Sequence, residues 1–388
     1  MKKVALITCY FQPNYGSMLQ AYATQLKLDE LNIDNETINI EGFRKEIKKK
    51  KLRYFARNVL SKDVVQDKLG YIKLKIAKAI NKELRENLKT RNIQFQEFSR
   101  KMFRISKVYN GIDELHDEAH RYQAFVVGSD QLWLPTNIEA DYYTLSFVPE
   151  DIKKISYATS FGVSLLPVRQ SKEAKKFLPR FDYLSVREQS GKELVYKLIG
   201  QLPDVVCDPT LLLTKDEWLK AIPSKQVIDG NYIFCYFLGE NPYPREVAKR
   251  IKKMTNCKII ALQHIDSYIK SDAGFADEFP YNIGPSEFVN LIRNAKYVCT
   301  DSFHGTVFSI INEKSFFTFR RFYKKSKMST NSRIDSLIDI VGLNDRLIEN
   351  EQWTESLLDN SIDYVNISNK LDSFRSKSIE FLKKSIEA

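Results

Sequence analysis

Hydrophobic residues along this chain follow two alternating spacings. Short apolar runs are each followed by a stretch in which apolar residues recur every three or four positions. Such runs are typical of strands buried in a parallel sheet, and the stretches between them are typical of covering helices. In the first half of the chain the predicted strands span residues 4–8, 37–40, 124–127, 155–159, 183–186 and 205–207.

The pattern restarts after residues 214–230, which contain Pro223 and Gly230. The second series of predicted strands covers residues 232–238, 258–262, 297–300 and 315–319, and a long terminal helix is predicted over 367–386. We therefore predict the α/β class with two Rossmann-like domains, residues 1–213 and 231–388, facing a cleft. We expect the terminal helix to cross back to the first domain.

A basic segment at residues 44–107 interrupts the first series. Residues 41–110 contain 21 Lys or Arg and seven Asp or Glu, a net charge of +14 in a chain whose total is +11. Helical patterns at 64–80 and 82–103 predict an inserted helical hairpin or subdomain. Three interpretations are open: a solvated helix face, a surface for anionic lipid or a lipid-linked substrate, and nucleic-acid binding. The last is disfavoured because no nucleic-acid module accompanies the charge.

The remaining composition is that of a globular protein, with 43% hydrophobic and 28% charged residues among 388. No apolar run reaches the roughly 18 residues that a membrane-spanning helix needs. The five cysteines are scattered and odd in number, with neither disulfide nor metal-site spacing. These features predict a cytoplasmic protein without a structural metal.

The most informative stretch is residues 297–311, where a predicted strand runs directly into a predicted helix. Asp301 or Ser302 is the expected helix cap, and Gly305 lies in the first turn. Free backbone N–H groups and the positive end of the helix dipole would make an anion site there. His304, one of four histidines, stands at that point. The alternative is a histidine that only packs against or caps the helix.

Other charged residues follow the predicted strands. Arg320 and Arg321 come directly after the strand at 315–319, and they either meet His304 over one crevice or are solvated loop charges. Strands of the first half end near Asp130, Arg187 and Asp208, which we expect along a common edge. Arg187 has a simpler alternative, an ion pair with Glu188 or Asp182. The loop containing Asn14, Tyr15 and Gly16 is either a ligand loop or a plain turn.

Six motifs in order extend this picture. They are Asn14-Tyr15-Gly16, the stretch 127–133 (VGSDQLW), the stretch 156–162 (SYATSFG), Ser185-Val186-Arg187-Glu188, Asp208-Pro209-Thr210 and the stretch 300–306 (TDSFHGT). In this set the chain resembles the polysaccharide pyruvyl transferase family. The resemblance covers roughly residues 4–40 and 120–345, and leaves the basic segment 44–107 without a counterpart.

The resemblance implies a fold like that of GT-B glycosyltransferases. It also implies transfer of a pyruvyl group from phosphoenolpyruvate to a sugar, usually as a cyclic ketal across two hydroxyls. The acceptor would be a cell-surface polysaccharide or its lipid-linked precursor, which suggests a protein at the inner face of the membrane. No cofactor, metal or nucleic acid is implied.

The family's donor residues carry over by motif to Arg187 and His304, with a third basic residue at Arg320 or Arg321. The residues around them, Ser302 and Gly305, are further donor-site candidates, with Asp301 as a catalytic candidate. Acceptor-side candidates are Asn14, Tyr15, Gly16, Ser129 and Asp130.

This chemistry suits the residue types. Phosphoenolpyruvate is a small multiply charged anion, and the Arg side chain matches carboxylate and phosphate groups bidentately. A histidine near its ordinary pKa serves as acid and then base, with Asp301 or Asp130 orienting it or taking the hydroxyl proton. Two rival functions remain. A nucleotide-sugar glycosyltransferase of GT-B fold would need an acidic ribose ligand, for which Glu278 and Glu287 are candidates. A non-catalytic binding protein would act through the basic segment.

Overall fold

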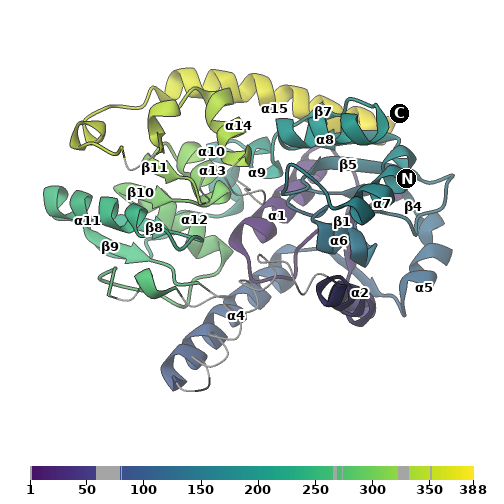
Figure 1. Ribbon diagram of the computed structural model, residues 1–388, viewed down its shortest axis with the longest axis horizontal. Coiled ribbons are helices and arrows are strands. Elements are labelled where there is room, and N and C mark those ends of the chain that lie inside the picture. The colour runs from purple at the N-terminus through teal and green to yellow at the C-terminus, as the bar shows by residue number, and fades with distance from the viewer. Residues whose placement is uncertain are drawn as a thin grey trace.

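The computed structural model describes residues 2–57, 79, 81–264, 269–272, 274–321, 332–349 and 352–388. Two parallel sheets lie side by side, each with helices packed on it, and the chain completes one before it enters the other (Figure 1). The predicted α/β class with two Rossmann-like domains is therefore confirmed. All five cysteines are free and buried.

The N-terminal domain is built on a seven-stranded parallel sheet in the order β3-β2-β1-β4-β5-β6-β7. Its central strands are buried on both faces, which explains their continuous apolar runs. The strands are β1 (Lys3–Ile7), β2 (Asn35–Asn39), β3 (Ile105–Val108), β4 (Tyr122–Val127), β5 (Lys153–Thr159), β6 (Tyr183–Val186) and β7 (Asp204–Val205). The main helices packed with them are α1 (Tyr15–Glu30), α5 (Ile112–Asp117), α6 (Pro135–Ala140), α7 (Val168–Phe177) and α8 (Gln189–Ile199).

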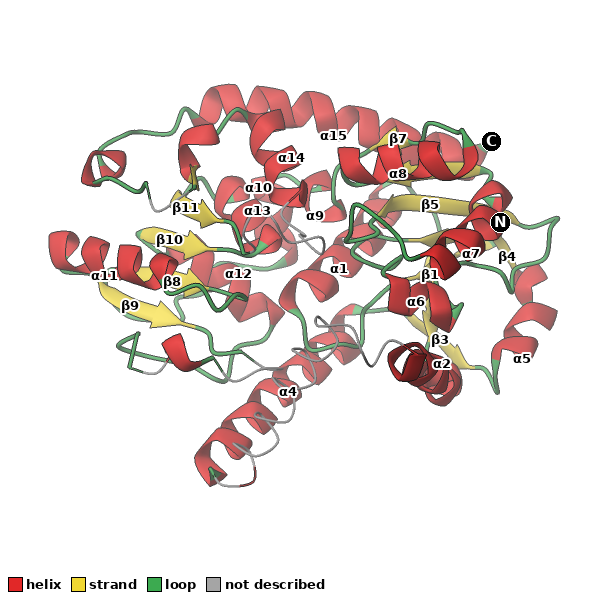
Figure 2. Ribbon diagram, in the orientation of Figure 1, coloured by secondary structure: helices red, strands yellow, loops and turns green. Residues whose placement is uncertain are grey.

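The C-terminal domain has a five-stranded parallel sheet in the order β12-β11-β10-β8-β9. The strands are β8 (Tyr232–Tyr236), β9 (Lys258–Ala261), β10 (Tyr297–Thr300), β11 (Ser315–Phe319) and β12 (Leu347–Ile348). Its helices are α11 (Tyr243–Thr255), α12 (Pro285–Asn294), α13 (Phe303–Ile311) and α14 (Ser332–Val341), visible around the left-hand sheet in Figure 2.

The order of the strands indicates where each sheet is expected to bind a ligand. In the N-terminal sheet the order reverses between β1 and β4, which pair in parallel with Leu6 opposite Val126. In the C-terminal sheet it reverses between β8 and β10, where Cys235 lies opposite Cys299. Ligands of open α/β sheets bind outside the carboxyl ends of strands at such a reversal. The loops after these four strands are therefore the first place to look for function.

Helix α1 forms part of the junction between the domains. Its first residue, Tyr15, is buried, and its hydroxyl donates a hydrogen bond to the carbonyl oxygen of Ile283 (3.0 Å). The Tyr15 ring stacks on Phe288 of α12 with 4.6 Å between ring centroids. Tyr15, predicted on the acceptor side, therefore belongs to the contact between the two domains.

The terminal helix α15 (Tyr364–Glu387) runs along both domains (Figure 1). Its C-terminal half is bonded to the first domain. The Ser378 hydroxyl accepts a hydrogen bond from the N–H of Cys207 (2.9 Å), and the Arg375 Nε donates to the carbonyl of Leu211 (2.8 Å). The helix thus links the last residues of the chain to the end of the first domain.

The basic segment contains two described helices, α2 (Arg44–Arg57) and α4 (Lys82–Met102). The predicted helix over 64–80 lies outside the described residues, apart from Ala79. The predicted end of the insertion at residue 107 is wrong, because Ile105–Val108 is β3, the edge strand that pairs with β2. The β-branched residues at both ends of this run, Ile105 and Val108, favour a strand. The polar residues between them continue the basic, polar character of the preceding helix and so conceal the strand in the sequence.

Helix α4 is not part of a self-contained subdomain. Arg91 is fully buried and donates from Nη1 to the carbonyl of Gln263 (2.6 Å) and from Nη2 to that of Pro280 (3.0 Å). Both acceptors belong to the second domain, so α4 connects the domains. In contrast, α2 has no buried residue and lies against α6.

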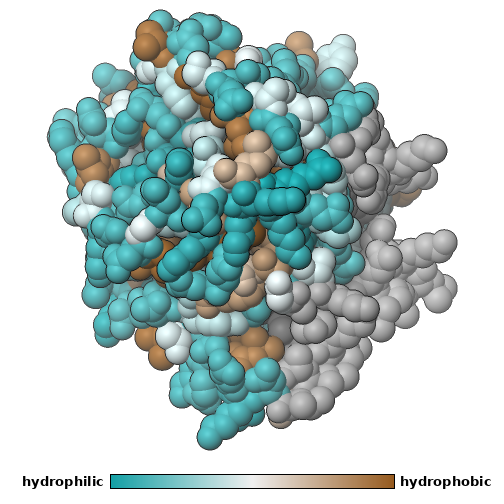
Figure 3. Space-filling model, turned by 90° about the vertical axis from the view of Figure 1, so that its left-hand side faces the viewer, coloured by the Kyte–Doolittle hydropathy of each residue, from teal (hydrophilic) through white to brown (hydrophobic). Residues whose placement is uncertain are grey.

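The face formed by the C-terminal domain is mostly hydrophilic, with only scattered hydrophobic side chains (Figure 3). In the part of the chain that the structure describes, none of the helices combines the length and the apolar character needed to span a lipid bilayer.

Replacing Ser378 tests the attachment of α15. In Ser378→Ala the buried N–H of Cys207 loses its acceptor, and a buried unsatisfied donor costs about 1–3 kcal/mol. We expect the free energy of unfolding, measured by denaturant titration, to fall by that amount. Ser376→Ala on the exposed side of the same helix is the control, and it should change stability by less than about 0.5 kcal/mol. Equal effects in the two variants would contradict the anchoring role.

Candidate active site

The C-terminal domain presents His304 at the start of α13. Ser302 is the helix cap, and its Oγ accepts a hydrogen bond from the N–H of Gly305 (3.3 Å). A Cβ atom on Gly305 would lie 2.4 Å from the Thr300 Oγ1, so the close packing of helix on strand requires glycine. Of the two predicted caps, Ser302 is the one used, and Gly305 serves packing.

Asp301 has a different neighbour from the one predicted. Its Oδ1 accepts from the N–H of Leu238 (2.6 Å) and its Oδ2 from that of Gly239 (2.8 Å). These bonds hold the loop after β8, and they occupy both carboxylate oxygens. The suggestion that Asp301 orients His304 is not supported, because the carboxylate beside His304 is Asp208.

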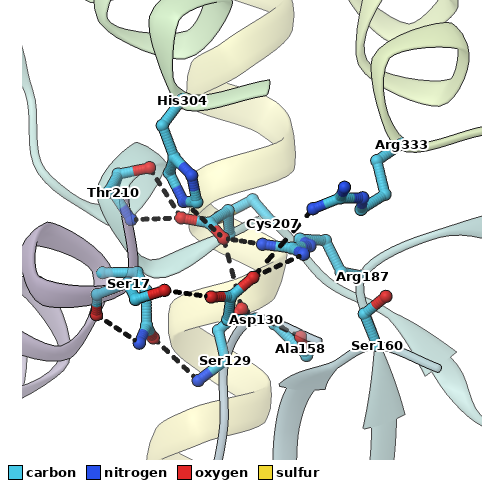
Figure 4. Close-up of polar contacts among 12 residues, drawn as sticks. Ser17, Ser129, Asp130, Ala158, Ser160, Arg187, Cys207, Thr210, His304 and Arg333 are labelled. Carbon is cyan, nitrogen blue, oxygen red and sulfur yellow. Dashed lines mark hydrogen bonds and ion pairs between the residues drawn. The ribbon is translucent and has the colours of Figure 1, made fainter. Parts of the chain in front are cut away.

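His304 crosses from the second domain to the first. The ring is buried, with Nε2 3.7 Å from the Asp208 Oδ2, close enough for a charge interaction but long for a hydrogen bond. A Cβ atom on Gly16 of α1 would lie 1.9 Å from the His304 Nδ1. Only glycine permits this approach, so Gly16 creates the space in which His304 meets the first domain. Figure 4 shows the His304 ring pointing into the cluster that contains Thr210 and Asp130.

Arg187 lies at the centre of the buried charges. Its Nη1 donates to the Asp208 Oδ2 (2.5 Å), and its Nη2 lies 3.5 Å from the Asp130 Oδ1. Glu188 is more distant, at 3.9 Å from Nε. Asp182 instead accepts from the N–H of Lys154 (2.7 Å). The predicted common edge of Asp130, Arg187 and Asp208 is therefore formed. Figure 4 shows Arg187 and Asp130 facing each other.

Asp208 is held as a carboxylate. Burial raises the pKa of this group, but His304, Arg187 and Thr210 stabilise the anion and bring the pKa far below its ordinary value. Thr210 donates to Oδ1 from both its N–H (3.0 Å) and its hydroxyl (2.6 Å). The Ser129 hydroxyl lies 3.2 Å from Oδ2.

Asp130 is the second carboxylate of the site and has a positive φ of 74°. Its Oδ2 accepts from the Ser17 hydroxyl of α1 (2.5 Å). Burial raises the pKa of Asp130, yet the charges of Arg187, His304 and Arg333 leave it below its ordinary value. Ser129 is fixed too, since its N–H donates to the Gln20 Oε1 (2.8 Å).

Arg333 is a site residue that the sequence reasoning missed. It projects from the first turn of α14, with its guanidinium 5.8 Å from the centroid of Phe303 and its Nη1 4.0 Å from the Asp130 Oδ1. Arg187 lies 4.7 Å from the same ring. Burial, then repulsion from Arg187, lowers the pKa of Arg333 to about 10. A sequence signal existed: Arg333 lies four positions before Leu337, in the apolar stripe of its helix.

The two adjacent arginines after β11 lie in different surroundings. Arg320 donates from Nε to Asp335 (3.1 Å), and its Nη2 lies 2.6 Å from Glu349. Arg321 packs beside Gly239, and its positive charge contributes to the lowered pKa of Arg333. Arg321 is therefore the member of the pair that faces the cluster.

The remaining candidates have structural partners. Asn14 caps α1 by accepting from the N–H of Ser17 (3.1 Å). Of the two possible ribose ligands, Glu278 pairs with Lys258 (3.0 Å), and Glu287 accepts from the N–H of Gly284 (3.0 Å) at the start of α12.

Several buried donors in this cluster make no hydrogen bond to a described residue, although some lie within charge-interaction distance of a carboxylate. Within the described residues, the Nε and Nη2 of Arg187, the Nε2 of His304 and the Nε of Arg333 have no hydrogen-bond partner. Buried polar groups are normally satisfied, so a group of buried donors without hydrogen bonds indicates a place that suits an oxygen-rich anion. Across the ranges that the structure covers, no three His, Cys, Asp or Glu side chains are grouped to hold a metal ion.

Comparisons with solved structures find distant likenesses. UDP-GlcNAc 2-epimerase from Methanocaldococcus jannaschii is 13% identical over 95% of this chain and 98% of its own, with a TM-score of 0.46. The enzyme from Neisseria meningitidis is 14% identical over 99% and 100%, also with a TM-score of 0.46. E. coli ADP-heptose lps heptosyltransferase II is 10% identical over 97% and 99%, with a TM-score of 0.34.

No curated protein matches the chain significantly. A family described as polysaccharide pyruvyl transferase, in contrast, matches residues 14–321, which include the Asn14-Tyr15-Gly16 loop, Arg187, Asp208, His304 and Arg321. The matched region covers most of the chain, and we conclude that this protein belongs to the polysaccharide pyruvyl transferase family.

Proposed function

We propose that the protein transfers the pyruvyl group of phosphoenolpyruvate to a sugar of a cell-surface polysaccharide or its lipid-linked precursor, forming a ketal across two hydroxyls. The family membership supports pyruvyl transfer. The observation that carries the donor assignment is the group of buried donors without acceptors on Arg187, His304 and Arg333.

The donor would bind between the guanidinium groups and the start of α13. Phosphoenolpyruvate carries a carboxylate and a phosphate, both of which match the fork of an arginine. Nη1 of Arg187 is held by Asp208, while among the described residues its Nε and Nη2 face carboxylates only at 3.5 Å or more, form no hydrogen bond, and would bind the donor. Arg333 and Arg321 supply further positive charge, and an anion between them would relieve the repulsion that lowers the pKa of Arg333.

His304 would move the protons. As imidazolium it protonates the methylene carbon of phosphoenolpyruvate, and the developing cation at the neighbouring carbon is attacked by the first sugar hydroxyl, whose proton returns to His304. Phosphate then leaves, the second hydroxyl closes the ketal, and its proton leaves with the phosphate. Asp208 remains ionised, because its pKa lies below its ordinary value, and it stabilises the imidazolium. Asp130, on the side of α1, is the carboxylate we assign to the acceptor.

Attachment of residues 44–107 to an anionic membrane surface from the cytoplasmic side remains a prediction. The charge of α2 supports it, and the vesicle measurements described below for that helix test it.

The proposed reaction predicts a pyruvyl adduct on a glycan. Candidate sugar acceptors incubated with the protein and phosphoenolpyruvate should gain a pyruvyl group detectable by mass spectrometry, with release of one phosphate. Because arginines rather than a metal are proposed to hold the departing phosphate, the reaction should persist in excess chelator. Loss of activity in chelator that one divalent ion restores would overturn the metal-free mechanism. Transfer of a sugar from a nucleotide donor instead would overturn the donor assignment.

His304 should affect turnover more than donor binding. His304→Ala leaves Arg187, Arg333 and the N–H groups of α13 in place. The affinity for phosphoenolpyruvate should therefore remain within about tenfold of wild type, which corresponds to a binding free energy changed by no more than about 1.4 kcal/mol. Turnover should fall by roughly 10²–10⁴, as expected for a general acid–base group. Calorimetry and single-turnover rates measure the two quantities, also for His304→Gln. His120→Ala, at an exposed histidine, is the control. Near-normal turnover in both His304 variants would make this histidine purely structural.

The neighbouring arginines after β11 offer a matched comparison. Arg321→Ala and Arg333→Ala should each weaken phosphoenolpyruvate binding by about ten- to a hundredfold, since a hydrogen bond to a charged group contributes about 1.5–3 kcal/mol. Arg320→Ala should leave donor affinity unchanged, because Arg320 is paired with Asp335 and Glu349. Arg333→Lys should recover only part of the loss. Equal losses at Arg320 and Arg321 would show that only general positive charge matters.

A further inference from the structure

A second concentration of positive charge lies away from the catalytic cluster, between α2, α6 and α7. These elements enclose a cavity of about 470 Å³. Six basic side chains line it: Lys50, Arg53, Arg57, Arg169, Lys176 and Arg180. Three of these belong to α2, the basic helix that has no buried residue of its own. The excess charge of the basic segment is thus partly collected in one basin.

The acidic residues of the basin do not neutralise it. The lining contains three carboxylates, Glu139, Asp141 and Glu173, so the positive charges exceed the negative ones by three. Glu139 accepts from the Nη1 of Arg57 (2.5 Å) and the Nε of Arg169 (3.2 Å), which ties α2 to α7 across the cavity. Its side chain is only 8% exposed, so this carboxylate holds the two walls together.

The other lining charges differ in how fully they are paired. Arg180 donates from Nε to Glu150 (2.8 Å) and from Nη2 to the carbonyl of Val148 (2.8 Å). Asp141 accepts from the Thr144 hydroxyl (2.6 Å), and Glu173 pairs with Lys176 (3.0 Å). Among the described residues, Arg53 has no carboxylate within ion-pair distance, and Lys50 has only Glu46 on its own helix (3.1 Å). An exposed pair of that kind contributes little, so Lys50 and Arg53 are the residues free to bind an added anion.

We propose that this basin is a binding site for a phosphate or diphosphate group. Arginine forks and lysine ammonium groups from separate walls suit a compact polyanion, and the volume lies within the usual range for small-molecule sites, about 300–1,000 Å³. The apolar lining consists of Ile138 and Phe177, too little to hold a nucleobase or a lipid tail. The enclosing walls also favour a compact group over a flat membrane surface.

Two walls of the basin, α6 and α7, closely follow loops of the candidate active site in the chain. Helix α6 begins five residues after Asp130, and α7 begins eight residues after Ser160, which donates to Glu188 beside Arg187. The binding of a phosphate group stands on the basin's own geometry. The assignment of that group to the sugar acceptor, as a sugar phosphate or a lipid-linked diphosphate, rests on the proposed function.

Pyrophosphate binding to the full chain tests the site. The measurement is calorimetric and is made in the Arg333→Ala background, so that the central anion site is already impaired. Adding Lys50→Ala and Arg53→Ala should weaken pyrophosphate binding about tenfold or more, because two charged donors are lost. The matched control adds Lys45→Ala and Lys48→Ala, which remove the same charge from two exposed positions of α2 that do not line the basin. This control should stay within about threefold, as rim charges contribute little.

Several outcomes decide the matter. The site is overturned if the Lys50/Arg53 and Lys45/Lys48 double substitutions weaken pyrophosphate binding equally. It is also overturned if pyrophosphate still binds normally without Lys50 and Arg53. Sedimentation with anionic vesicles that depends on Lys45 and Lys48, without pyrophosphate binding, also overturns it and makes α2 a membrane surface. Competition by a soluble sugar diphosphate supports a soluble acceptor, whereas selective binding to neutral vesicles containing a polyprenyl diphosphate supports a lipid-linked one. If the wild-type protein shows no pyruvyl transfer while pyrophosphate still binds at the basin, only the proposed function is overturned.

Discussion

The buried ion pair between Arg187 and Asp208 is the interaction on which the site depends. Arg187 follows β6 and Asp208 follows β7, and their short contact fixes the carboxylate that His304 approaches from the other domain. Removing one partner of a buried pair costs about 3–5 kcal/mol, because the other charge is left uncompensated. A buried ion pair contributes little net stability compared with apolar packing. We therefore explain the presence of the Arg187–Asp208 pair by its positioning of the site residues.

Approach of the two domains completes the cluster. His304 reaches Asp208 only because Gly16 has no side chain, and the same stretch of α1 supplies Tyr15 to the domain junction and Ser17 to Asp130. Helix α15 and the buried Arg91 of α4 reinforce this contact at other points. The catalytic geometry is therefore a property of the junction, and neither sheet contains it alone.

Charge is distributed differently in the two regions that we propose to bind anions. In the centre, buried arginines with nitrogens that make no hydrogen bond within the described part of the chain lie beside carboxylates whose pKa is lowered, and the proposed function would combine donor binding and proton transfer in this one desolvated place. In the basin between α2 and α7, the basic side chains are more exposed and braced by Glu139. Such a site suits holding a charged group without chemistry. The function that we propose, with a small anionic donor and a large acceptor, would need both properties.

The sequence by itself determined the α/β class, the two parallel sheets and the polar residues at their edges, because strand burial, helix periodicity and capping are local properties. It correctly placed Arg187 and Asp130 after strand ends and His304 at the start of a helix. Only the tertiary structure decided which residues meet: Asp208 rather than Asp301 lies beside His304, Arg321 rather than Arg320 faces the cluster, and Arg333 joins it from α14. Those choices depend on how the sheets, helices and loops pack together, and contacts between residues far apart in the sequence leave no local pattern in a single chain.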